Sequence, residues 1–217
     1  MLIELYTIKF YNMKNYKIIL IISLLLVITF FLEKTNFENT SASFSFISYN
    51  SESNHSFSIL LHDDVKPNSK IYFTNSKWNG TRFGIKGGDL IWNTGAQIIK
   101  KGTIINFRFL NTDVQTNFGK IKGKINLNKS GDAVFAYLGD GIKMPTKFIC
   151  AVAADSTNYG TLVNTNLKHG VSVISYPRNT IHAQLKSNIL PDIKTIYQIE
   201  NYNFKSNIKS LSNLVVN

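Results

Sequence analysis

Cysteine is almost missing from this chain of 217 residues, which has one, Cys150, and therefore no internal disulfide. Cys150 lies in an apolar stretch, residues 148–154, where a lone cysteine is expected to be a small buried hydrophobic side chain. A reactive thiol requires an electropositive, partly exposed setting, which this stretch does not offer. The sequence thus excludes a disulfide-stapled domain and gives no reason to expect a cysteine nucleophile.

Glutamate is also scarce, because only Glu52 and Glu200 remain after residue 42. Acid and base catalysis by a pair of glutamates is therefore not expected. The histidines are scattered along the chain at His55, His62, His169 and His182. The chain contains no HExxH or GxSxG spacing and no cysteine–histidine arrangement. We therefore expect a protein that is not an enzyme and has no cofactor; an enzyme with an unrecognised site is the last of three alternatives.

Hydrophobic residues form one long run near the N-terminus, residues 18–32, in which Ser23 and Thr29 are the polar interruptions. Lys14 and Lys17 precede this run, and a polar segment follows it. A basic region, an apolar core of this length and a polar end are typical of a secretory signal peptide. A spanning helix usually needs about 20 apolar residues, so the run is short for a permanent anchor.

The predicted leader covers residues 1–42, with translation starting at Met13 and cleavage after Ala42, where the flanking residues are small. This interpretation predicts a secreted, periplasmic or cell-surface protein. The alternative is an uncleaved N-terminal helix, which would hold the protein to the membrane through residues 18–32 alone.

Acidic residues are fewer than basic ones. The chain has 13 Asp and Glu and 24 Lys and Arg, which gives a net charge of +11. Lysine supplies nearly all of the positive charge, because the arginines are Arg82, Arg108 and Arg178. A strong positive charge favours anionic partners such as nucleic acids. Asparagine, isoleucine and lysine are abundant together, as an AT-rich genome would produce, so a coding bias explains part of the charge equally well.

Helical periodicity is weak after the leader, and short strands separated by turns take its place. Residues 57–61 and 105–109 alternate between apolar and polar side chains, which is typical of half-buried antiparallel strands. Residues 132–138 and 148–154 are apolar on both faces, as central strands of a core are. Clusters of Gly, Asn, Asp and Pro separate these runs.

These patterns predict an all-β fold, an immunoglobulin-like antiparallel β-sandwich that forms a single domain over residues 43–217. The N-terminal signal or anchor helix precedes it. The end of the chain departs from the strand pattern, because four apolar residues fit one face of a short C-terminal helix: Ile208, Leu211, Leu214 and Val215.

Four segments resemble a β-rich module of secreted and surface bacterial proteins. Residues 71–78 (IYFTNSKW) resemble its "IYFTDNGW" block, with Asn75 in place of Asp. Residues 88–94 (GDLIWNT) resemble "EGTLTWT", and residues 127–139 (LNKSGDAVFAYLG) resemble "LSTSGDQIFAYQG". Residues 167–170 resemble its "LPxGLTxG" stretch without the proline.

The module is similar to lamin-tail-like, immunoglobulin-like sandwiches and occurs in exported proteins, sometimes beside extracellular nuclease or sorting domains. The resemblance covers roughly residues 55–185, and turn glycines and strand hydrophobic residues carry most of it. It therefore implies a non-catalytic accessory or adhesive module and transfers no active site.

Two acidic groups are weak candidates for a metal site. His62, Asp63 and Asp64 are consecutive, but neighbouring residues of a strand point to opposite faces, so turn hydrogen bonding is the expected role of the two aspartates. Asp132 and Asp140 bracket a strand next to glycines. Calcium favours six to eight oxygen ligands, and no Asp-x-Asp-x-Asp loop is present. We therefore predict no metal.

The sharpest indication of binding is a row of three lysines, Lys120, Lys122 and Lys124. In a strand these share one face at intervals of about 6.6–6.8 Å, and the isoleucines at 121 and 125 point the other way. Such a row suits phosphates or sulfated glycans, with salt-dependent affinity. Three further lysines are candidates for the same surface: Lys100, Lys101 and Lys129. The alternative is that lysine on an edge strand prevents aggregation between sheets.

Trp78 and Trp92 are expected in the core, because large aromatic side chains dominate sandwich interiors; two exposed tryptophans would instead suit carbohydrate stacking. The sequence as a whole predicts an exported, non-catalytic β-sandwich that acts in surface display, adhesion or ligand binding. The alternative is a polyanion-binding accessory module of an extracellular enzyme system. The expected partner is accordingly a polyanion or a cell-surface ligand.

Overall fold

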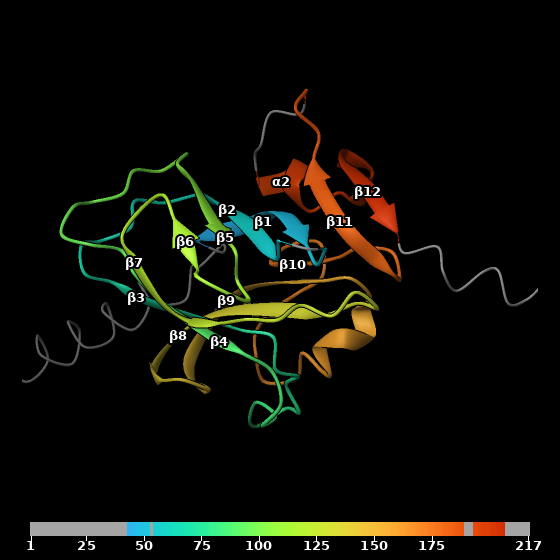
Figure 1. Ribbon diagram of the computed structural model, residues 1–217, viewed down its shortest axis with the longest axis horizontal. Helices are drawn as coiled ribbons and strands as arrows, with labels where there is room; N and C mark the ends of the chain where they lie inside the picture. Colours follow the sequence, from blue (N-terminus) through green and yellow to red (C-terminus); the bar gives the residue numbers. More distant parts are fainter. Residues whose placement is uncertain (1–42, 53, 189–192, 207–217) are drawn as a thin grey trace, which may run out of the picture. The chain divides into compact units, whose positions relative to one another are not determined.

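The computed structural model describes residues 43–52, 54–188 and 193–206, whose strands form two sheets of six (Figure 1). Sheet I contains, in spatial order, β12 (Tyr202–Ser206), β11 (Thr180–Leu185), β1 (Phe44–Asn50), β2 (Ser56–Leu61), β5 (Ile104–Arg108) and β6 (Gln115–Thr116). Sheet II contains β10 (Val173–Ser175), β9 (Met144–Ala153), β8 (Ala133–Gly141), β3 (Lys70–Thr74), β4 (Asp89–Asn93) and β7 (Lys120–Lys124).

The two sheets pack face to face around aromatic side chains, so the predicted all-β sandwich is confirmed. Phe73 of β3 in sheet II lies 5.1 Å, centroid to centroid, from Phe57 of β2 and from Phe107 of β5. Trp92 of β4 meets the ring of Phe107 edge-on at 5.4 Å. All these side chains are fully or almost fully buried. Tilted and edge-on contacts at these distances are favourable for aromatic rings and add to the burial of their apolar area.

The strands predicted from alternation are present. Residues 57–61 lie in β2 and residues 105–108 in β5, with their apolar side chains directed into the core between the sheets. These two strands pair antiparallel, with Phe57 opposite Phe107 and Ile59 opposite Ile105. Alternation predicts strands here because successive side chains of a strand point to opposite faces.

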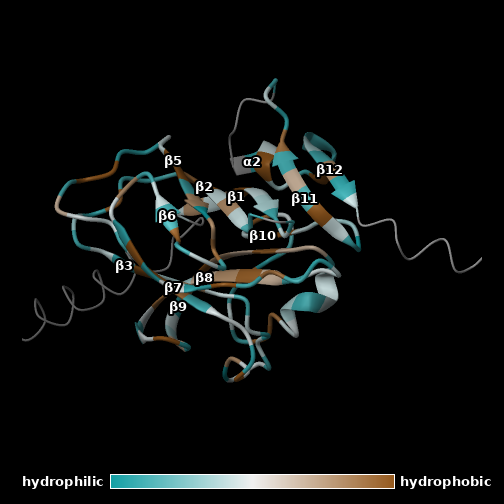
Figure 2. Cartoon of the chain, viewed as in Figure 1, coloured by the Kyte–Doolittle hydropathy of each residue, from teal (hydrophilic) through white to brown (hydrophobic). Residues whose placement is uncertain are grey.

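A second, smaller core covers the outer face of sheet II and explains why β8 and β9 are apolar on both faces. Trp78, Phe83 and Tyr159 come from connecting segments and pack on Phe135 and Tyr137 of β8. The hydrophobic colouring follows β8 through the middle of the sheet (Figure 2). Both predictions about single side chains in these cores are confirmed as well: the two tryptophans and the lone cysteine are buried.

One strand pair departs from the predicted antiparallel arrangement, because β10 runs parallel to β9. A parallel neighbour requires a long crossover. Here the connection between the two strands includes the 3-10 helix η1 (Ser156–Tyr159), whose first turn is capped by the carboxylate of Asp155. The predicted strand direction is therefore wrong for β10, which lies at the edge of sheet II, and the two-sheet arrangement is unaffected.

Helical structure in the described residues is confined to η1, the single turn α2 (Ile193–Ile196) and η2 (Ile199–Asn201). None of these helical segments is long and apolar enough to cross a membrane. The predicted leader, residues 1–42 with the apolar core 18–32, lies outside the described residues, and so does the predicted C-terminal helix around Leu211.

Candidate functional site

A groove lies where the connection between β3 and β4 approaches the segment between β7 and β8. Its volume is about 1380 Å³. Four lysines line it: Lys77, Lys86, Lys124 and Lys129. Four asparagines line it too: Asn75, Asn111, Asn126 and Asn128. His55 and Asp132 complete its titratable groups, and we call this site the basic groove.

The floor of the basic groove is a hydrogen-bonded pair, Asn75 and Asp132. Asn75 Nδ2 donates to Asp132 Oδ2 at 2.8 Å and to the carbonyl oxygen of Asn126 at 3.0 Å. Asn75 Oδ1 accepts from the backbone amide of Gly88 at 2.6 Å. One amide side chain thus joins the β3–β4 connection to both ends of the 126–132 segment, which fixes the width of the groove.

The carboxylate of Asp132 is an internal structural group. Oδ1 accepts from the Ala133 amide at 2.9 Å, and Oδ2 also accepts from the Asn128 amide at 3.2 Å. Burial raises the pKa of this carboxyl above its ordinary value, while the hydrogen bond from Asn75 and the nearby charge of Lys77 act in the opposite direction. Both carboxylate oxygens of Asp132 are thus engaged by donors of the chain itself.

His55 forms the inner wall of the basic groove and is held as a neutral ring. Its Nδ1 accepts from the Leu127 amide at 2.9 Å, which places the proton of the neutral ring on Nε2. Burial lowers the pKa of His55, and the charge of Lys129 lowers it further. His55 is therefore a donor at neutral pH.

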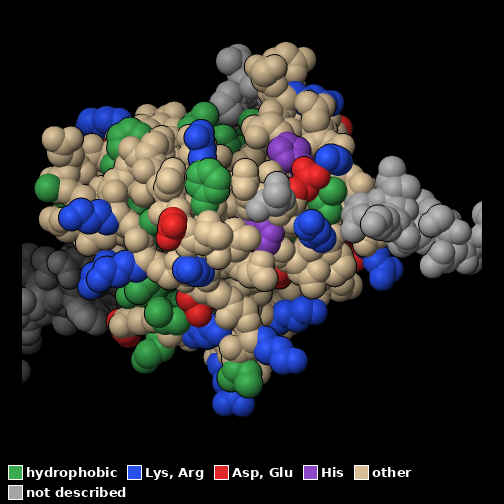
Figure 3. Space-filling model, in the orientation of Figure 1, with side chains coloured by type: hydrophobic (Ala, Val, Ile, Leu, Met, Phe, Trp, Pro, Cys, Tyr) green, Lys and Arg blue, Asp and Glu red, His purple; other side chains and the backbone are tan. Residues whose placement is uncertain are grey.

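The rim of the groove is positively charged. Among the described residues, none of the four groove lysines has a carboxylate within 4.0 Å, whereas ion pairs do form elsewhere at Lys100, Lys143, Arg178 and Lys205. All four groove lysines are exposed. Figure 3 shows basic side chains spread over one face of the molecule with few acidic ones between them. Unpaired ammonium groups around a concave surface attract anions and release counterions when an anion binds.

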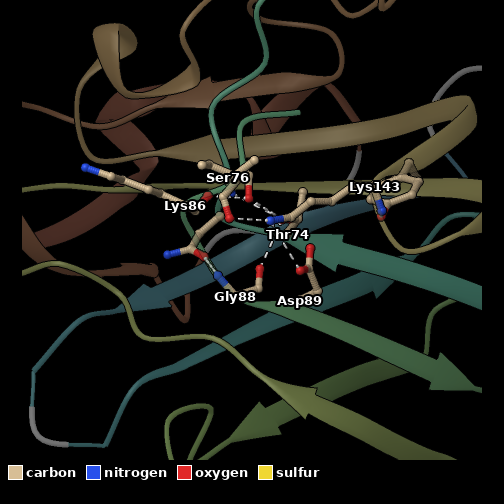
Figure 4. A network of polar contacts seen from close by, with 9 residues as sticks. Thr74, Ser76, Lys86, Gly88, Asp89 and Lys143 are labelled. Carbon is tan, nitrogen blue, oxygen red and sulfur yellow. Dashed lines mark hydrogen bonds and ion pairs between the residues drawn. The ribbon is translucent and has the colours of Figure 1, made fainter. Parts of the chain in front are cut away.

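The loop of residues 84–88 is fixed by a polar network that Figure 4 shows around Thr74 and Ser76. Ser76 Oγ donates to the carbonyl oxygen of Lys86 at 2.6 Å. Thr74 Oγ1 donates to the carbonyl oxygen of Gly88 at 3.0 Å and accepts from the Ser76 amide at 3.2 Å. Hydrogen bonds from the end of β3 therefore fix the position of the loop that carries Lys86.

A buried carboxylate lies beneath this loop. Asp89 Oδ2 is 3.6 Å from Lys143 Nζ, and both side chains are largely shielded from solvent. Asp89 is also directly opposite Lys124 in the β4–β7 register, although no contact of 4.0 Å or less joins their charged groups. The negative charge of Asp89 is thus matched by Lys143, which leaves Lys124 available to the groove.

The structure divides the six predicted lysines among three places. Lys124 and Lys129 line the basic groove, and Lys120 and Lys122 continue from it along β7. This strand lies at the edge of sheet II, as the aggregation-preventing interpretation also requires. The other two lysines, Lys100 and Lys101, lie outside the groove.

Lys100 and Lys101 bind the turn that precedes β3. Lys100 Nζ forms an ion pair with Asp64 Oδ2 at 2.8 Å, and the Lys101 amide donates to Asp64 Oδ1 at 2.9 Å. These contacts lower the pKa of the Asp64 carboxyl, chiefly through the hydrogen bond from Lys100. Asp64 therefore acts as a turn residue.

The weak metal candidates are separated by their environments. His62 is buried with Nε2 2.7 Å from Ser45 Oγ, whereas Asp63 and Asp64 are exposed. Across the part of the chain that the structure describes, no group of three or more His, Cys, Asp and Glu side chains could hold a metal ion.

Two groove lysines were not among the sequence candidates. Lys77 and Lys86 lie in the connection between β3 and β4, 34 and more residues before the lysine row of β7. The available signal was the repetition of Asn, Gly and Lys in two connections, residues 75–88 and 126–131. Only the sheet order, with β4 between β3 and β7, brings these connections together.

The arrangement suits recognition of anionic oxygens. Lysine and asparagine supply eight of the fifteen lining residues, and the described lining contains no Phe, Tyr or Trp side chain on which a base or a sugar ring could stack. The chain matches no protein-family model, no curated protein and no solved structure. Any functional conclusion therefore rests on the geometry of the groove.

Proposed function

We propose that this protein is an exported, non-catalytic β-sandwich that binds linear polyanions. The observation that carries the proposal is the basic groove, in which four unpaired lysines surround a floor of amides and a neutral histidine. Lys124 belongs both to this groove and to the lysine row of β7. The groove and the row thus form one continuous positive surface on which a chain of phosphates or sulfates can lie.

The proposed location rests on the predicted signal peptide, and the proposed immunoglobulin-like topology rests on the strand pattern and the resemblance to lamin-tail-like modules. A polyanion-binding module is consistent with the extracellular nucleases and surface proteins in which such modules occur. A non-catalytic role is supported by the composition of the groove. Its one carboxyl group, that of Asp132, accepts hydrogen bonds from three donors of the chain.

The test is retention of the full chain on heparin, single-stranded DNA and polyphosphate as a function of salt. Three groove lysines are replaced together (Lys77→Gln, Lys124→Gln and Lys129→Gln). The matched control replaces three exposed lysines outside the groove: Lys66, Lys168 and Lys194. Both variants lose the same net charge, so a difference between them reports the location of the charge.

We expect wild-type binding to weaken linearly with the logarithm of salt concentration. Each phosphate contact contributes a slope of about −0.7 to −0.9, so the groove variant should lose about 2 units of slope and the control variant almost none. The choice among the three polymers identifies the chemistry of the anion. Equal losses in both variants, or no retention of the wild type at low salt, would refute the groove as a polyanion site.

A further inference from the structure

Two neighbouring loop ends expose aliphatic side chains to solvent beside the basic groove. Ile85, in the loop before β4, is 94% exposed and is the most exposed of the large hydrophobic residues that the structure describes. Ile142 and Met144, at the turn between β8 and β9, are 49% and 61% exposed. Single exposed hydrophobic residues need no explanation, but a group of them on adjacent loops marks a contact surface.

The two loop ends are tied together by Lys143. Its Nζ donates to the carbonyl oxygen of Ile85 at 3.1 Å and forms the ion pair with Asp89. Its backbone amide donates to Tyr137 Oη at 2.7 Å. Ile85 and the two residues that flank Lys143 therefore form one surface, which we call the aliphatic tip (Ile85, Ile142 and Met144).

The aliphatic tip is presented by fixed backbone. The β8–β9 hairpin continues as paired strands to Gly141 and Met144. In the other loop, the Thr74–Ser76 network holds Lys86 and Gly88 after Ile85, and the Gly84 amide before it donates to the carbonyl oxygen of Lys77 at 2.8 Å. Exposing these side chains to water costs free energy that could be recovered only through burial against a partner. A preorganised surface loses less entropy when that partner binds.

Charge complementarity indicates what the partner is. Ile85 itself lies in the wall of the basic groove, next to Lys86 and close to Lys77 and Lys124. Asp140, in the hairpin that carries Ile142, is an exposed acidic residue. Aliphatic side chains that project from a surface with lysines behind them suit the interface of an anionic bilayer, where methyl groups enter the acyl boundary and ammonium groups meet phosphate.

We infer that the aliphatic tip is a docking site for an anionic lipid bilayer. The chemistry of the projecting side chains favours a bilayer over a protein partner. A side chain that is 94% exposed protrudes and offers no pocket for a partner to fill. A fluid bilayer receives such a projection without shape complementarity. The tip shares Ile85 and the neighbouring lysines with the wall of the basic groove, but the inference rests on the exposed aliphatic side chains and does not depend on polyanion binding.

The chain provides a clean way to test this contact. Cys150 is the one cysteine of the sequence and is buried, so a cysteine introduced at the surface can be labelled alone. The full chain with Ile85→Cys is labelled with the polarity-sensitive fluorophore NBD, and the matched control carries the label at Val163, which is 61% exposed and lies outside the tip. Both variants keep residues 18–32, so any binding through that run affects the two labels equally.

The labelled proteins are mixed with vesicles of phosphatidylcholine alone or of phosphatidylcholine with phosphatidylglycerol. We expect a blue shift and a rise in NBD emission at position 85 with the anionic vesicles, weakened by salt, and no such change at position 163. A spin-labelled lipid should quench the first label and not the second.

Three outcomes would overturn the inference. The first is an unchanged emission at position 85 with anionic vesicles. The second is an equal shift at both positions, which would indicate adsorption without orientation. The third is a shift at position 85 that depends on protein concentration and needs no vesicles, which would assign the tip to contact between copies of the chain. Retention on polyanions is measured with the unlabelled wild-type chain and remains unchanged if only the bilayer inference fails.

Discussion

Asn75 and Asp132 are 57 residues apart in the chain, yet the Asn75 amide nitrogen lies 2.8 Å from an Asp132 carboxylate oxygen. An amide can donate to Asp132, whereas a second carboxylate at this distance would repel it. The identity of residue 75 therefore determines whether the floor of the basic groove is a hydrogen bond or a repulsive pair.

The first prediction concerns this contact. Asn75→Asp should lower the free energy of unfolding at pH 7 by at least about 2 kcal/mol, because Asp132 loses a donor and gains a neighbouring like charge. The loss should shrink as the pH falls toward 5, because one of the two carboxyl groups then has a raised pKa and is protonated. Urea unfolding at the two pH values measures both effects.

Asn111→Asp is the matched control, because it adds the same charge to the lining of the same groove and no described hydrogen bond of the Asn111 side chain is lost. It should change stability by no more than about 0.5 kcal/mol. Equal destabilisation by the two substitutions would contradict the role assigned to the 75–132 contact.

The second prediction compares two glycines of one loop. A Cβ atom on Gly88 would lie 2.1 Å from the carbonyl oxygen of Lys124 and 2.9 Å from the Cα atom of Ile125, both backbone atoms of the segment beginning with β7. Gly88→Ala must therefore separate β4 from β7 at this end. We expect a loss of at least about 3 kcal/mol in the free energy of unfolding.

Gly84→Ala provides the contrast, because the nearest atom to its Cβ would be the carbonyl oxygen of Lys77 at an ordinary 3.6 Å. It should change stability by no more than about 0.5 kcal/mol. Thermal or urea unfolding of the two variants decides the point, and comparable stability of both would show that β7 can shift to accept a side chain at position 88.

The sequence predicted the sandwich because its strands alternate, and the same physics explains where the prediction failed. Periodicity identifies a strand such as Ser56–Leu61 from six residues, but β10 has only three, too few to show a period. Its parallel pairing with β9 depends on the path of the preceding crossover, which local sequence does not encode. The direction of this one strand was therefore predicted wrongly.

The candidate site was predictable only in part. The lysines of β7 could be found because their spacing matches the strand repeat. Lys77 and Lys86 could not, since their position in the groove depends on the hydrogen bonds of Ser76 and Asn75 to the far side of the loop. Long-range contacts of this kind leave no periodic signal. What the sequence did show was an unusual number of asparagines and glycines in the two connections.

The third prediction tests the centre of the core. The ring of Phe73 contacts four other phenylalanine rings, with centroids 5.1 to 6.4 Å away: Phe44, Phe46, Phe57 and Phe107. Phe73→Ala should lower the free energy of unfolding by about 3–5 kcal/mol, because it removes these contacts and leaves a cavity between the sheets.

Phe118→Ala is the control for this change, because Phe118 is 40% exposed. It should cost clearly less, within about 1.5 kcal/mol, as partly solvated side chains lose less burial. Urea denaturation gives both values. A Phe73 variant as stable as the Phe118 variant would mean that the two sheets do not share this aromatic core.

The last prediction concerns a buried chain of hydroxyl and imidazole groups. Ser45 Oγ is 2.7 Å from His62 Nε2 and 2.7 Å from Tyr197 Oη. Burial raises the pKa of the Tyr197 hydroxyl, so this group keeps its proton at neutral pH. The Ser45 hydroxyl links the two side chains, and a neutral His62 ring can pair with it as acceptor or as donor, depending on its tautomer.

Burial is also the main cause of a lowered pKa at His62; the charge of Asp63 opposes this shift and that of Lys101 adds to it. Above the unfolded-state pKa of about 6.5 the ring is neutral in both states and stability does not depend on it. As the pH falls through this value, the unfolded chain takes up a proton that the folded chain does not. Stability therefore falls with falling pH until the lowered folded pKa is reached.

His55, whose pKa burial and Lys129 also lower, acts in the same direction. We expect the free energy of unfolding to decrease between pH 7.5 and pH 5.5, by no more than about 1.4 kcal/mol per pH unit for each of the two histidines. His62→Gln preserves a hydrogen-bonding side chain but cannot titrate, so its slope should be smaller than that of the wild type. A wild type that becomes more stable on acidification through this range, or a variant with an unchanged slope, would show that His62 accepts a proton in the folded state.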